Sequence, residues 1–266
     1  MLYTLGILFA IYIILIAPIK RKEMDDFKSV HYAHRGLHND ERAENSMSAF
    51  KAAVDGGWGI ELDIRLSLDG KLVVFHDDTL DRVCGREGKV IDFTADELAT
   101  FKLNGTEDGI PLFEDVLKMV DGRVKLLVEI KEDAGDNKVS LAACEMLDGY
   151  KGEFIIESFN PMSLRTVRAN RPHHVRGILS QRYYEYEQYR KPLYFILQSL
   201  LTNCLCRPAF IAFDHKHAPK SFALKFCRKL FGVPTLAWTV RSQEEENEAI
   251  KNGFDGIIFE KYIPKI

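Results

Sequence analysis

Seven side chains that could bind a metal, exchange protons or hold a phosphate stand on or beside four short apolar runs of the sequence. Each run is typical of a buried strand, although charged groups are costly to bury unless they are paired. Carboxylates are hard ligands for Mg²⁺ or Ca²⁺, histidines exchange protons near neutral pH, and arginine and lysine bind phosphate oxygens. Together these groups indicate a site that cleaves a phosphodiester. They are Glu61, Asp63 and Glu129, then His34 and His76, then Arg35 and Lys131.

The spacing of the carboxylates predicts that they face one another. Glu61 and Asp63 are two residues apart, so in a strand both side chains point to one face, and Glu129 and Lys131 repeat this spacing. Carboxylates that point inward from neighbouring strands must share a cation, because buried like charges repel strongly. The alternative is a structural role for them in ion pairs with Arg65 and Lys131.

Apolar runs and helical patterns alternate after residue 28, which predicts an α/β fold, a (β/α)8 TIM barrel. In such barrels the chemistry lies at the carboxyl ends of the strands, where the charged residues fall. A doubly wound open sheet competes, but this sequence lacks the glycine-rich phosphate loop that usually follows its first strand. The expected strands are residues 30–34, 59–66, 125–130, 153–158, 175–179, 209–213, 234–240 and 254–259. The expected helices are residues 46–54, 112–120, 139–147, 162–170, 193–201, 220–231 and 243–252.

One feature interrupts this alternation after the second strand. Residues 66–71 resemble a hairpin turn, which predicts an extra strand at 71–75 paired to the second strand. Residues 78–111 then form a small insertion with one short helix at 94–101. We place the whole barrel domain at residues 29–266.

Composition excludes several classes of protein. The 266 residues are 46% hydrophobic, which suffices for one large domain. The net charge of −3 is nearly balanced, and no nucleic-acid-binding signature occurs, so we expect no nucleic-acid partner. The five cysteines form no regular framework, which indicates small core or interface residues in a reducing compartment.

The N-terminal segment is of a different kind. Residues 2–19 carry no charge over 18 residues, just within the length that spans a bilayer, and three basic residues follow at 20–22. A cleavable signal peptide has its charges before the apolar run, and a buried domain helix usually has a polar face. The sequence therefore predicts an uncleaved transmembrane anchor at 2–19 and a charged juxtamembrane linker at 20–28. The positive-inside rule then predicts a single-pass membrane protein with a cytoplasmic catalytic domain.

A series of short motifs runs through the chain in a fixed order. They are His34-Arg35-Gly36, Glu44-Asn45-Ser46, Glu61-Leu62-Asp63, His76-Asp77, Thr79-Leu80-Asp81-Arg82, Glu129-Ile130-Lys131, Ser158-Phe159, Trp238-Thr239 and Asp255-Gly256-Ile257-Ile258. Each triplet alone is a weak signal, but in this order the set is highly specific. The chain resembles the glycerophosphodiester phosphodiesterase family across nearly all of its length after about residue 30.

The resemblance implies a TIM barrel that hydrolyses glycerophosphodiesters to an alcohol and glycerol 3-phosphate with one divalent metal, Mg²⁺ or Ca²⁺. It implies that Glu61, Asp63 and Glu129 hold this metal, and it places Glu44 near the same metal and the phosphate. It also implies a route in which a glycerol hydroxyl attacks first and water then opens a cyclic phosphate.

The resemblance further implies roles for the remaining motif residues. His34 and His76 act as general acid and base, without the sequence deciding which is which, and Arg35 and Lys131 hold the phosphoryl oxygens. The remaining matched residues are assigned to the substrate pocket, where the tryptophan either walls the glycerol end or fills the barrel. These pocket residues are Ser158, Phe159 and Trp238.

The chain departs from the family pattern at two places. Phe259-Glu260-Lys261 follows the last strand where the family often has threonine or asparagine with aspartate, and Val83-Cys84 replaces a more polar pair. We expect both departures to alter only the rim of the site, and hence substrate preference, without touching the metal or the histidines.

Three other functions stay open. A lysophospholipase D acting on lyso-phospholipids at the membrane would use the same catalytic groups. An inactive membrane-tethered barrel could serve for binding, although a retired site has no reason to keep buried charges. A phosphatidylinositol-specific phospholipase C shares the barrel and the histidine pair, but not the arrangement of Glu61, Asp63 and Glu129. Head-group preference, metal identity and oligomeric state are not readable from the sequence.

Residues 183–213 are rich in tyrosine and apolar residues, and two interpretations of them are equally supported. The segment is either a barrel helix with an aromatic rim or an amphipathic element that lies in a bilayer interface near the mouth of the site.

Overall fold

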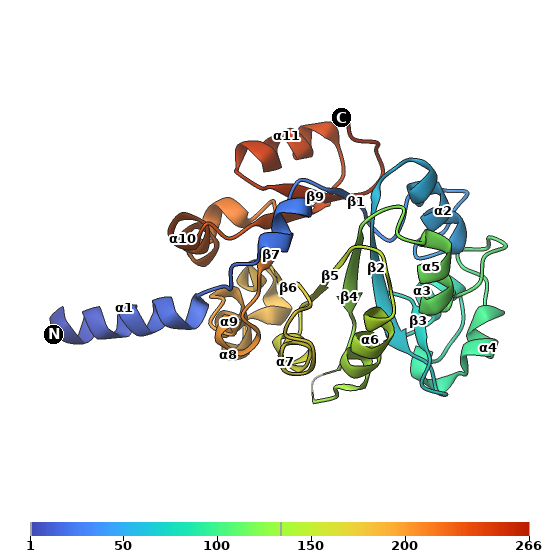
Figure 1. Cartoon of the computed structure of the whole chain (residues 1–266), viewed down its shortest axis with the longest axis horizontal. Coiled ribbons are helices and arrows are strands. Elements are labelled where there is room, and N and C mark those ends of the chain that lie inside the picture. Colours follow the sequence, from blue (N-terminus) through green and yellow to red (C-terminus); the bar gives the residue numbers. More distant parts are fainter. Residues whose placement is uncertain (1, 134, 266) are drawn as a thin grey trace.

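Eight parallel strands close into a barrel in this computed structural model, which describes residues 2–133 and 135–265 (Figure 1). Neighbouring strands follow one another around the barrel, and β1 pairs with both β2 and β9, which closes it. The predicted barrel is therefore confirmed, and β3 pairs antiparallel with β2 as the hairpin predicts. The strands are β1 (His31–Ala33), β2 (Gly59–Leu66), β3 (Leu72–Val74), β4 (Leu126–Ile130), β5 (Phe154–Ser158), β6 (Arg176–Ser180), β7 (Phe210–Asp214), β8 (Thr235–Val240) and β9 (Gly256–Phe259).

Helices follow the strands and cover the outside of the barrel (Figure 1). Side-chain caps start several of them: Asn160 accepts the Met162 N–H at 2.9 Å, and Ser242 accepts the Glu245 N–H at 3.2 Å. The α-helices are α1 (Leu2–Ile16), α2 (Met47–Asp55), α3 (Asp81–Cys84), α4 (Ala95–Ala99), α5 (Phe113–Val120), α6 (Lys138–Asp148), α7 (Pro161–Asn170), α8 (Pro192–Gln198), α9 (Asn203–Cys206), α10 (Phe222–Phe231) and α11 (Gln243–Lys251). Short 3-10 turns are η1 (Lys22–Asp26), η2 (Val90–Asp92), η3 (Tyr183–Glu185), η4 (Glu187–Tyr189) and η5 (Ala218–Lys220).

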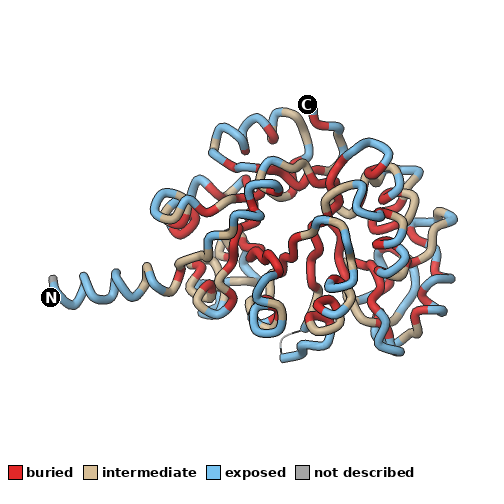
Figure 2. Tube along the Cα trace, in the orientation of Figure 1, coloured by how far each residue is buried: buried red, intermediate tan, exposed pale blue. Residues whose placement is uncertain are grey.

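Alternate residues of each strand face two different cores. In β4, Leu126 and Val128 pack outward against the helices, while Leu127 packs inside the barrel with Ile155 of β5. Because side chains alternate along a strand, Glu129 shares the inward face of Leu127. Figure 2 shows the resulting continuous burial along the strands. The barrel interior is thus apolar until the carboxyl ends of the strands, where charged side chains take over.

Two further segments complete the domain. The predicted linker at 20–28 contains η1, and its residues Met24 and Phe27 are buried in the barrel's interior core. The insertion at 78–111 contains α3, η2 and α4 around a small separate core, which includes Leu98 and Leu103 of the insertion and Val73 of β3.

The predicted transmembrane anchor is wrong. Helix α1 has 15 residues, and no helix among the described residues is long and apolar enough to cross a membrane. At 1.5 Å per residue such a helix reaches only about 22 Å, less than the roughly 30 Å of hydrocarbon in a bilayer. Its last turn packs against the barrel domain, because Ile16 is fully buried and its carbonyl accepts the Asn203 side-chain N–H at 2.9 Å.

The prediction of a single-pass membrane protein with a cytoplasmic domain is wrong with it, because it depended on that span. Helix α1 instead projects from the barrel, and most of its side chains are exposed (Figures 1 and 2). In the tyrosine-rich segment, Tyr194 packs against Tyr183 and Tyr189, with ring centroids 5.2 and 4.7 Å apart, while Leu193 and Phe195 are exposed.

Candidate active site

The chain turns sharply after β1, at His34, Arg35 and Gly36. Arg35 and Gly36 have φ angles of 55° and 79°, and a Cβ on Gly36 would lie 2.9 Å from the Ala49 carbonyl carbon. Glycine is therefore required for this close approach to α2. The turn points the Arg35 backbone N–H at Glu61 Oε2, 3.0 Å away. The motif thus ties the end of β1 to the carboxylates of β2.

Glu61, Asp63 and Glu129 converge inside the barrel. The parallel register places Asp63 beside Glu129, and ligand oxygens of all three residues lie within 4.8 Å of one another. Burial and neighbouring charge raise the pKa of Glu61 well above its usual value, and burial raises the pKa of Glu129 to about 7. Burial also acts on Asp63, but Lys131 and other cations hold the pKa of Asp63 well below its usual range. The sequence prediction of inward, converging carboxylates matches this geometry.

These residues fit a divalent cation. Lys131 Nζ lies 2.7 Å from Glu129 Oε1 and 3.1 Å from Asp63 Oδ1, yet Asp63 Oδ1 accepts no hydrogen bond from the described residues. A buried oxygen without a hydrogen bond is unfavourable unless it binds something else. Three carboxylates also exceed the charge of Lys131 and Arg35 beside them. An all-oxygen set of this kind suits a hard cation such as Mg²⁺ or Ca²⁺.

Both candidate histidines use Nδ1 to contact a carboxylate. His34 Nδ1 lies 2.7 Å from Glu260 Oε2, and His76 Nδ1 lies 2.6 Å from Asp77 Oδ1. Burial lowers the pKa of His34 to about 4 and lowers that of His76 as well. Each ring donates its Nδ1 proton to the carboxylate, which leaves Nε2 as the atom that can accept or release a proton. His34 Nε2 is 4.0 Å from Glu61 Oε2, next to the carboxylate cluster.

Glu260 is a residue whose role the sequence analysis missed. The expectation that this departure leaves the histidines untouched is wrong, because its carboxylate contacts the His34 ring. Its other oxygen lies 2.5 Å from Arg241 Nε, and His38 Nε2 is 3.6 Å from Oε2. The closure of β9 against β1 brings Glu260 to this place, since the His34 N–H donates to the Phe259 carbonyl at 2.9 Å.

Glu44 lies between two arginines and is not one of the three converging carboxylates. Arg35 Nη1 is 2.6 Å from its Oε1, and Arg82 contacts its two oxygens at 2.7 and 2.8 Å. Burial favours the protonated form, but these ion pairs lower the pKa of Glu44 to about 2. Arg82 also donates from Nε to Asp77 Oδ2 at 2.6 Å. A chain of ion pairs therefore connects Arg35 with the support of His76.

A cavity of about 230 Å³ holds most of the predicted residues. Phe159 and Trp238 form one wall, with ring centroids 5.4 Å apart and an interplanar angle of 86°. The structure does not bring Ser158 into this cavity, because its hydroxyl donates to the Ile130 carbonyl at 2.8 Å. The lining residues that the sequence analysis did not assign to the site are Glu157, Leu179, Thr239, Arg241 and Ile258, of which Thr239 and Ile258 stand in its motifs.

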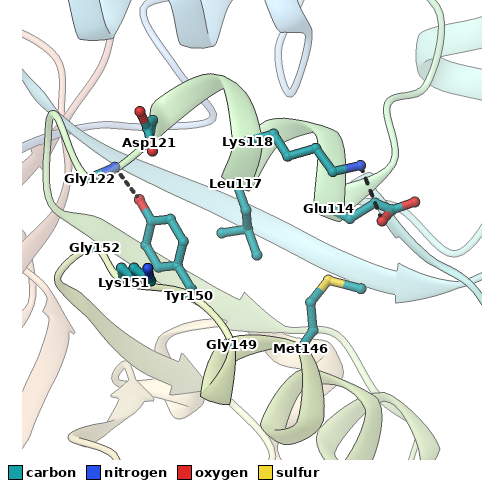
Figure 3. A pocket seen from close by; sticks show the side chains of 10 residues that line it. All are labelled: Glu114, Leu117, Lys118, Asp121, Gly122, Met146, Gly149, Tyr150, Lys151 and Gly152. Carbon is teal, nitrogen blue, oxygen red and sulfur yellow. Dashed lines mark hydrogen bonds and ion pairs between the residues drawn. The ribbon is translucent and has the colours of Figure 1, made fainter.

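Another cavity, of about 420 Å³, lies between α5 and α6 (Figure 3). It adjoins the loops that lead into β4 and β5, which is the amino-terminal side of those strands. Tyr150 accepts the Gly122 N–H at 3.1 Å, and Leu117 and Met146 provide apolar surface. None of the residues expected to do chemistry lines this cavity. The candidate active site lies at the opposite end of the barrel, at the carboxyl ends of the strands.

The barrel and the site together define a class of protein. Carboxylates, two histidines and two cations meet at the carboxyl ends of parallel strands, around a cavity for a small molecule. This combination is that of a phosphodiester hydrolase with a divalent-metal site.

Comparisons with known proteins agree with this class. Residues 34–262 match the Glycerophosphoryl diester phosphodiesterase family. The chain is 33% identical over 257 residues to the glycerophosphodiester phosphodiesterase of Caldanaerobacter subterraneus subsp. tengcongensis, covering 87% of this chain and 93% of that protein. The solved glycerophosphodiester phosphodiesterase of Thermotoga maritima is 27% identical with a TM-score of 0.67, covering 86% and 94% of the two chains. An Oleispira antarctica phosphodiesterase, solved with the product sn-glycerol-3-phosphate, has 21% identity and a TM-score of 0.70 over 88% and 94%.

The chain belongs to the glycerophosphoryl diester phosphodiesterase family. It is an enzyme, a phosphoric diester hydrolase, that cleaves glycerophosphodiesters to an alcohol and glycerol 3-phosphate. The predicted family and activity are confirmed.

Proposed function

We propose that the protein hydrolyses small glycerophosphodiesters, with His34 and His76 as the proton-transferring pair and with Glu61, Asp63 and Glu129 as the ligands of one Mg²⁺ or Ca²⁺. The observation that carries this proposal is the convergence of three buried carboxylates within 4.8 Å, beside a histidine whose Nε2 is free. When bound, the metal would neutralise charge on the phosphoryl oxygens and polarise the phosphorus centre.

The chain's own residues perform the remaining steps in this proposal. Arg35 and Lys131 attract the phosphate into a cavity whose carboxylates would otherwise repel it. One histidine removes the proton of the attacking hydroxyl at Nε2, and the other supplies a proton to the leaving alkoxide. Glu260 and Asp77 hold the two rings through Nδ1, which keeps each Nε2 directed to this task.

The size of the cavity favours water-soluble diesters over lyso-phospholipids. Pockets that bury a drug-sized ligand usually measure about 300–1,000 Å³. This cavity measures about 230 Å³, which suits a glycerophosphate unit, whereas an acyl chain would have to lie outside it. We therefore propose glycerophosphocholine-like compounds as the preferred substrates, with lysophospholipase D activity as the weaker one.

Product analysis tests this proposal. Glycerophosphocholine and lysophosphatidylcholine are incubated with the full chain, with and without EDTA, and the products are identified by mass spectrometry. We expect glycerol 3-phosphate and choline from the first substrate, at a rate about tenfold or more above that of the second, and no product with EDTA. Faster release of choline from the lyso-lipid, or activity that survives chelation, would contradict it.

A further prediction concerns Glu260 as a positioning residue. Glu260→Gln should lower kcat by about 100-fold with little change in KM, because the glutamine NH₂ can donate to His34 Nδ1 and stabilise the wrong tautomer. Glu260→Asp keeps a carboxylate and should retain most of the rate. Steady-state kinetics of the two variants with glycerophosphocholine measure the difference.

His38→Ala is the matched control, since its ring lies 3.6 Å from the same Glu260 carboxylate and forms no hydrogen bond or ion pair with another site residue in the part of the chain that the structure describes. We expect its kcat to equal that of the unmodified enzyme. Equal losses in Glu260→Gln and Glu260→Asp, or a loss confined to KM, would show that Glu260 does not act through the His34 tautomer.

A further inference from the structure

A second cluster of possible metal ligands lies away from the active site. It consists of Asp148, His173 and His174, whose ligand atoms lie within 4.8 Å of one another. Asp148 is the last residue of α6, and the two histidines stand in the loop between α7 and β6. These loops lead into β5 and β6, so the cluster lies at the amino-terminal end of the barrel, opposite the catalytic carboxylates.

A tight turn presents the two histidines next to each other. The His174 N–H donates to the Arg171 carbonyl at 3.0 Å, which closes a β-turn with Pro172 at its second position. Proline fixes the backbone angle that this position requires. The Arg21 guanidinium donates to the Pro172 carbonyl and ties the turn to the segment before β1. The backbone of both histidines is therefore held in place by contacts other than those of their rings.

Both imidazole rings direct Nε2 to the same carboxylate oxygen. Nε2 of His174 lies 3.2 Å from Asp148 Oδ1, and Nε2 of His173 lies 3.9 Å from this oxygen. In a tetrahedral zinc site with bonds of about 2.0–2.1 Å, neighbouring ligand atoms are about 3.3 Å apart. The first distance matches this spacing, and the exposed His173 side chain has room to close the second.

The surroundings of these atoms suit a ligand set. Arg171 donates from Nε to Asp148 Oδ2, which orients the carboxylate and leaves Oδ1 for a metal. Burial lowers the pKa of His174 to about 4, so its ring is neutral at neutral pH, as a metal ligand must be. The His174 ring is also fixed by packing, because it lies edge to face on Phe154 with centroids 5.1 Å apart.

An ion-pair network alone does not account for this arrangement. A hydrogen bond from His174 to Asp148 explains one contact, but 3.9 Å is too long for a hydrogen bond from His173. Two protonated rings with centroids 4.6 Å apart would also repel each other. A metal ion instead draws two neutral rings and the carboxylate to one point.

The ligand types select a transition-metal ion. Imidazole nitrogens suit Zn²⁺, Cu²⁺ and Ni²⁺, whereas Mg²⁺ and Ca²⁺ prefer oxygen ligands. We propose that Asp148, His173 and His174 bind Zn²⁺, with water in the remaining position. The ion links the end of α6 to the turn before β6, so its binding stabilises the folded barrel. This site takes no part in hydrolysis, so the inference does not depend on the proposed function.

Zinc titration of the full chain tests the site. Asp63→Asn serves as the background after EDTA treatment, because this substitution weakens the separate carboxylate site in the barrel mouth. Calorimetry should show one Zn²⁺ bound per chain. Adding His174→Ala or Asp148→Asn should weaken this binding by about 100-fold or more, because each removes one of three ligands. Absence of Zn²⁺ binding in the background itself would overturn the proposal.

Two more variants separate coordination from charge and from loss of folding. Glu145→Gln is the matched control, because Glu145 is an exposed carboxylate on the same helix that does not belong to the cluster. It should leave Zn²⁺ affinity unchanged. His173→Ala replaces an exposed side chain, so the fold is preserved, and it should weaken binding by about 10-fold or more. Equal affinities in Glu145→Gln, His173→Ala and Asp148→Asn would overturn the proposal.

Co²⁺ gives a readout on a chain with an intact barrel mouth. It can replace Zn²⁺, and its visible absorption is strong in a tetrahedral site with imidazole ligands and weak in a six-coordinate oxygen site. The absorption should persist in Asp63→Asn and disappear in His173→Ala. In thermal melting, Zn²⁺ at about 100 times its Kd should raise the Tm by about 5 °C, except in His173→Ala. Absorption that disappears in Asp63→Asn, but persists in His173→Ala, would place the ion in the barrel mouth and overturn the proposal.

Discussion

Asp63→Asn should lower the hydrolysis of glycerophosphocholine by about 1,000-fold or more, and added Mg²⁺ or Ca²⁺ should not restore it. The substitution keeps the shape of the side chain and its place beside Asn45, whose Nδ2 lies 2.8 Å from Oδ2. It removes one of the three negative charges that would hold the cation and leaves Lys131 beside a neutral oxygen. Initial rates across a metal titration, after EDTA treatment, measure both the affinity for metal and the maximal rate.

Asp148→Asn is the matched control for this experiment. Asp148 belongs to a different group of potential ligands, together with His173 and His174. Asp148 is exposed, whereas Glu61, Asp63 and Glu129 are all buried. Its substitution should change neither the rate nor the dependence on metal. A wild-type rate in Asp63→Asn, at any metal concentration, would remove the buried carboxylates from the mechanism.

His34→Ala and His76→Ala should each lower kcat by about 100- to 10,000-fold, the range typical of lost general acid or base catalysis. Stopped assays with glycerophosphocholine measure the loss. A glycerol phosphodiester with p-nitrophenol as its leaving group then separates the two roles, because this leaving group departs without a proton. The variant that recovers on this substrate lacks the general acid, and the variant that does not recover lacks the general base.

His173→Ala serves as the control, because the His173 side chain is 67% exposed and lies outside the cavity. Circular dichroism and thermal melting check that the catalytic variants remain folded. Activity within tenfold of the unmodified enzyme in either catalytic variant would exclude that histidine from proton transfer.

The barrel and most of its site could be predicted because both follow from local patterns. Apolar runs of five to eight residues specify buried strands, and the alternation of side chains specifies which of their charged residues point inward. The inward direction of Glu61 and Asp63 in β2, and of Glu129 in β4, could be predicted from the sequence of each strand alone. The same alternation along β5 places Glu157 on the inward face, although the motif at the end of this strand begins only at Ser158.

Glu260 could not be found in this way, because its contact depends on closure of the barrel. It stands 226 residues from His34 in the chain, and only the pairing of β9 with β1 brings the two together. Hydropathy misled the prediction for the N-terminus for a related reason. An apolar segment has the same hydropathy whether it enters a bilayer or is buried against its own domain, as Ile16 is.

The ion pairs of Arg82 give the insertion a part in catalysis. Arg82 comes from α3 and contacts both Asp77, which supports His76, and Glu44, which supports Arg35. The insertion packs around a small core that it shares with Val73 and Phe75, apart from the barrel's main clusters, and such peripheral units commonly open at lower free energy than a central sheet. Opening of the insertion would release the supports of His76 and Arg35 while the barrel stayed folded. We therefore expect heating to abolish activity through local unfolding of residues 78–111 before the barrel melts.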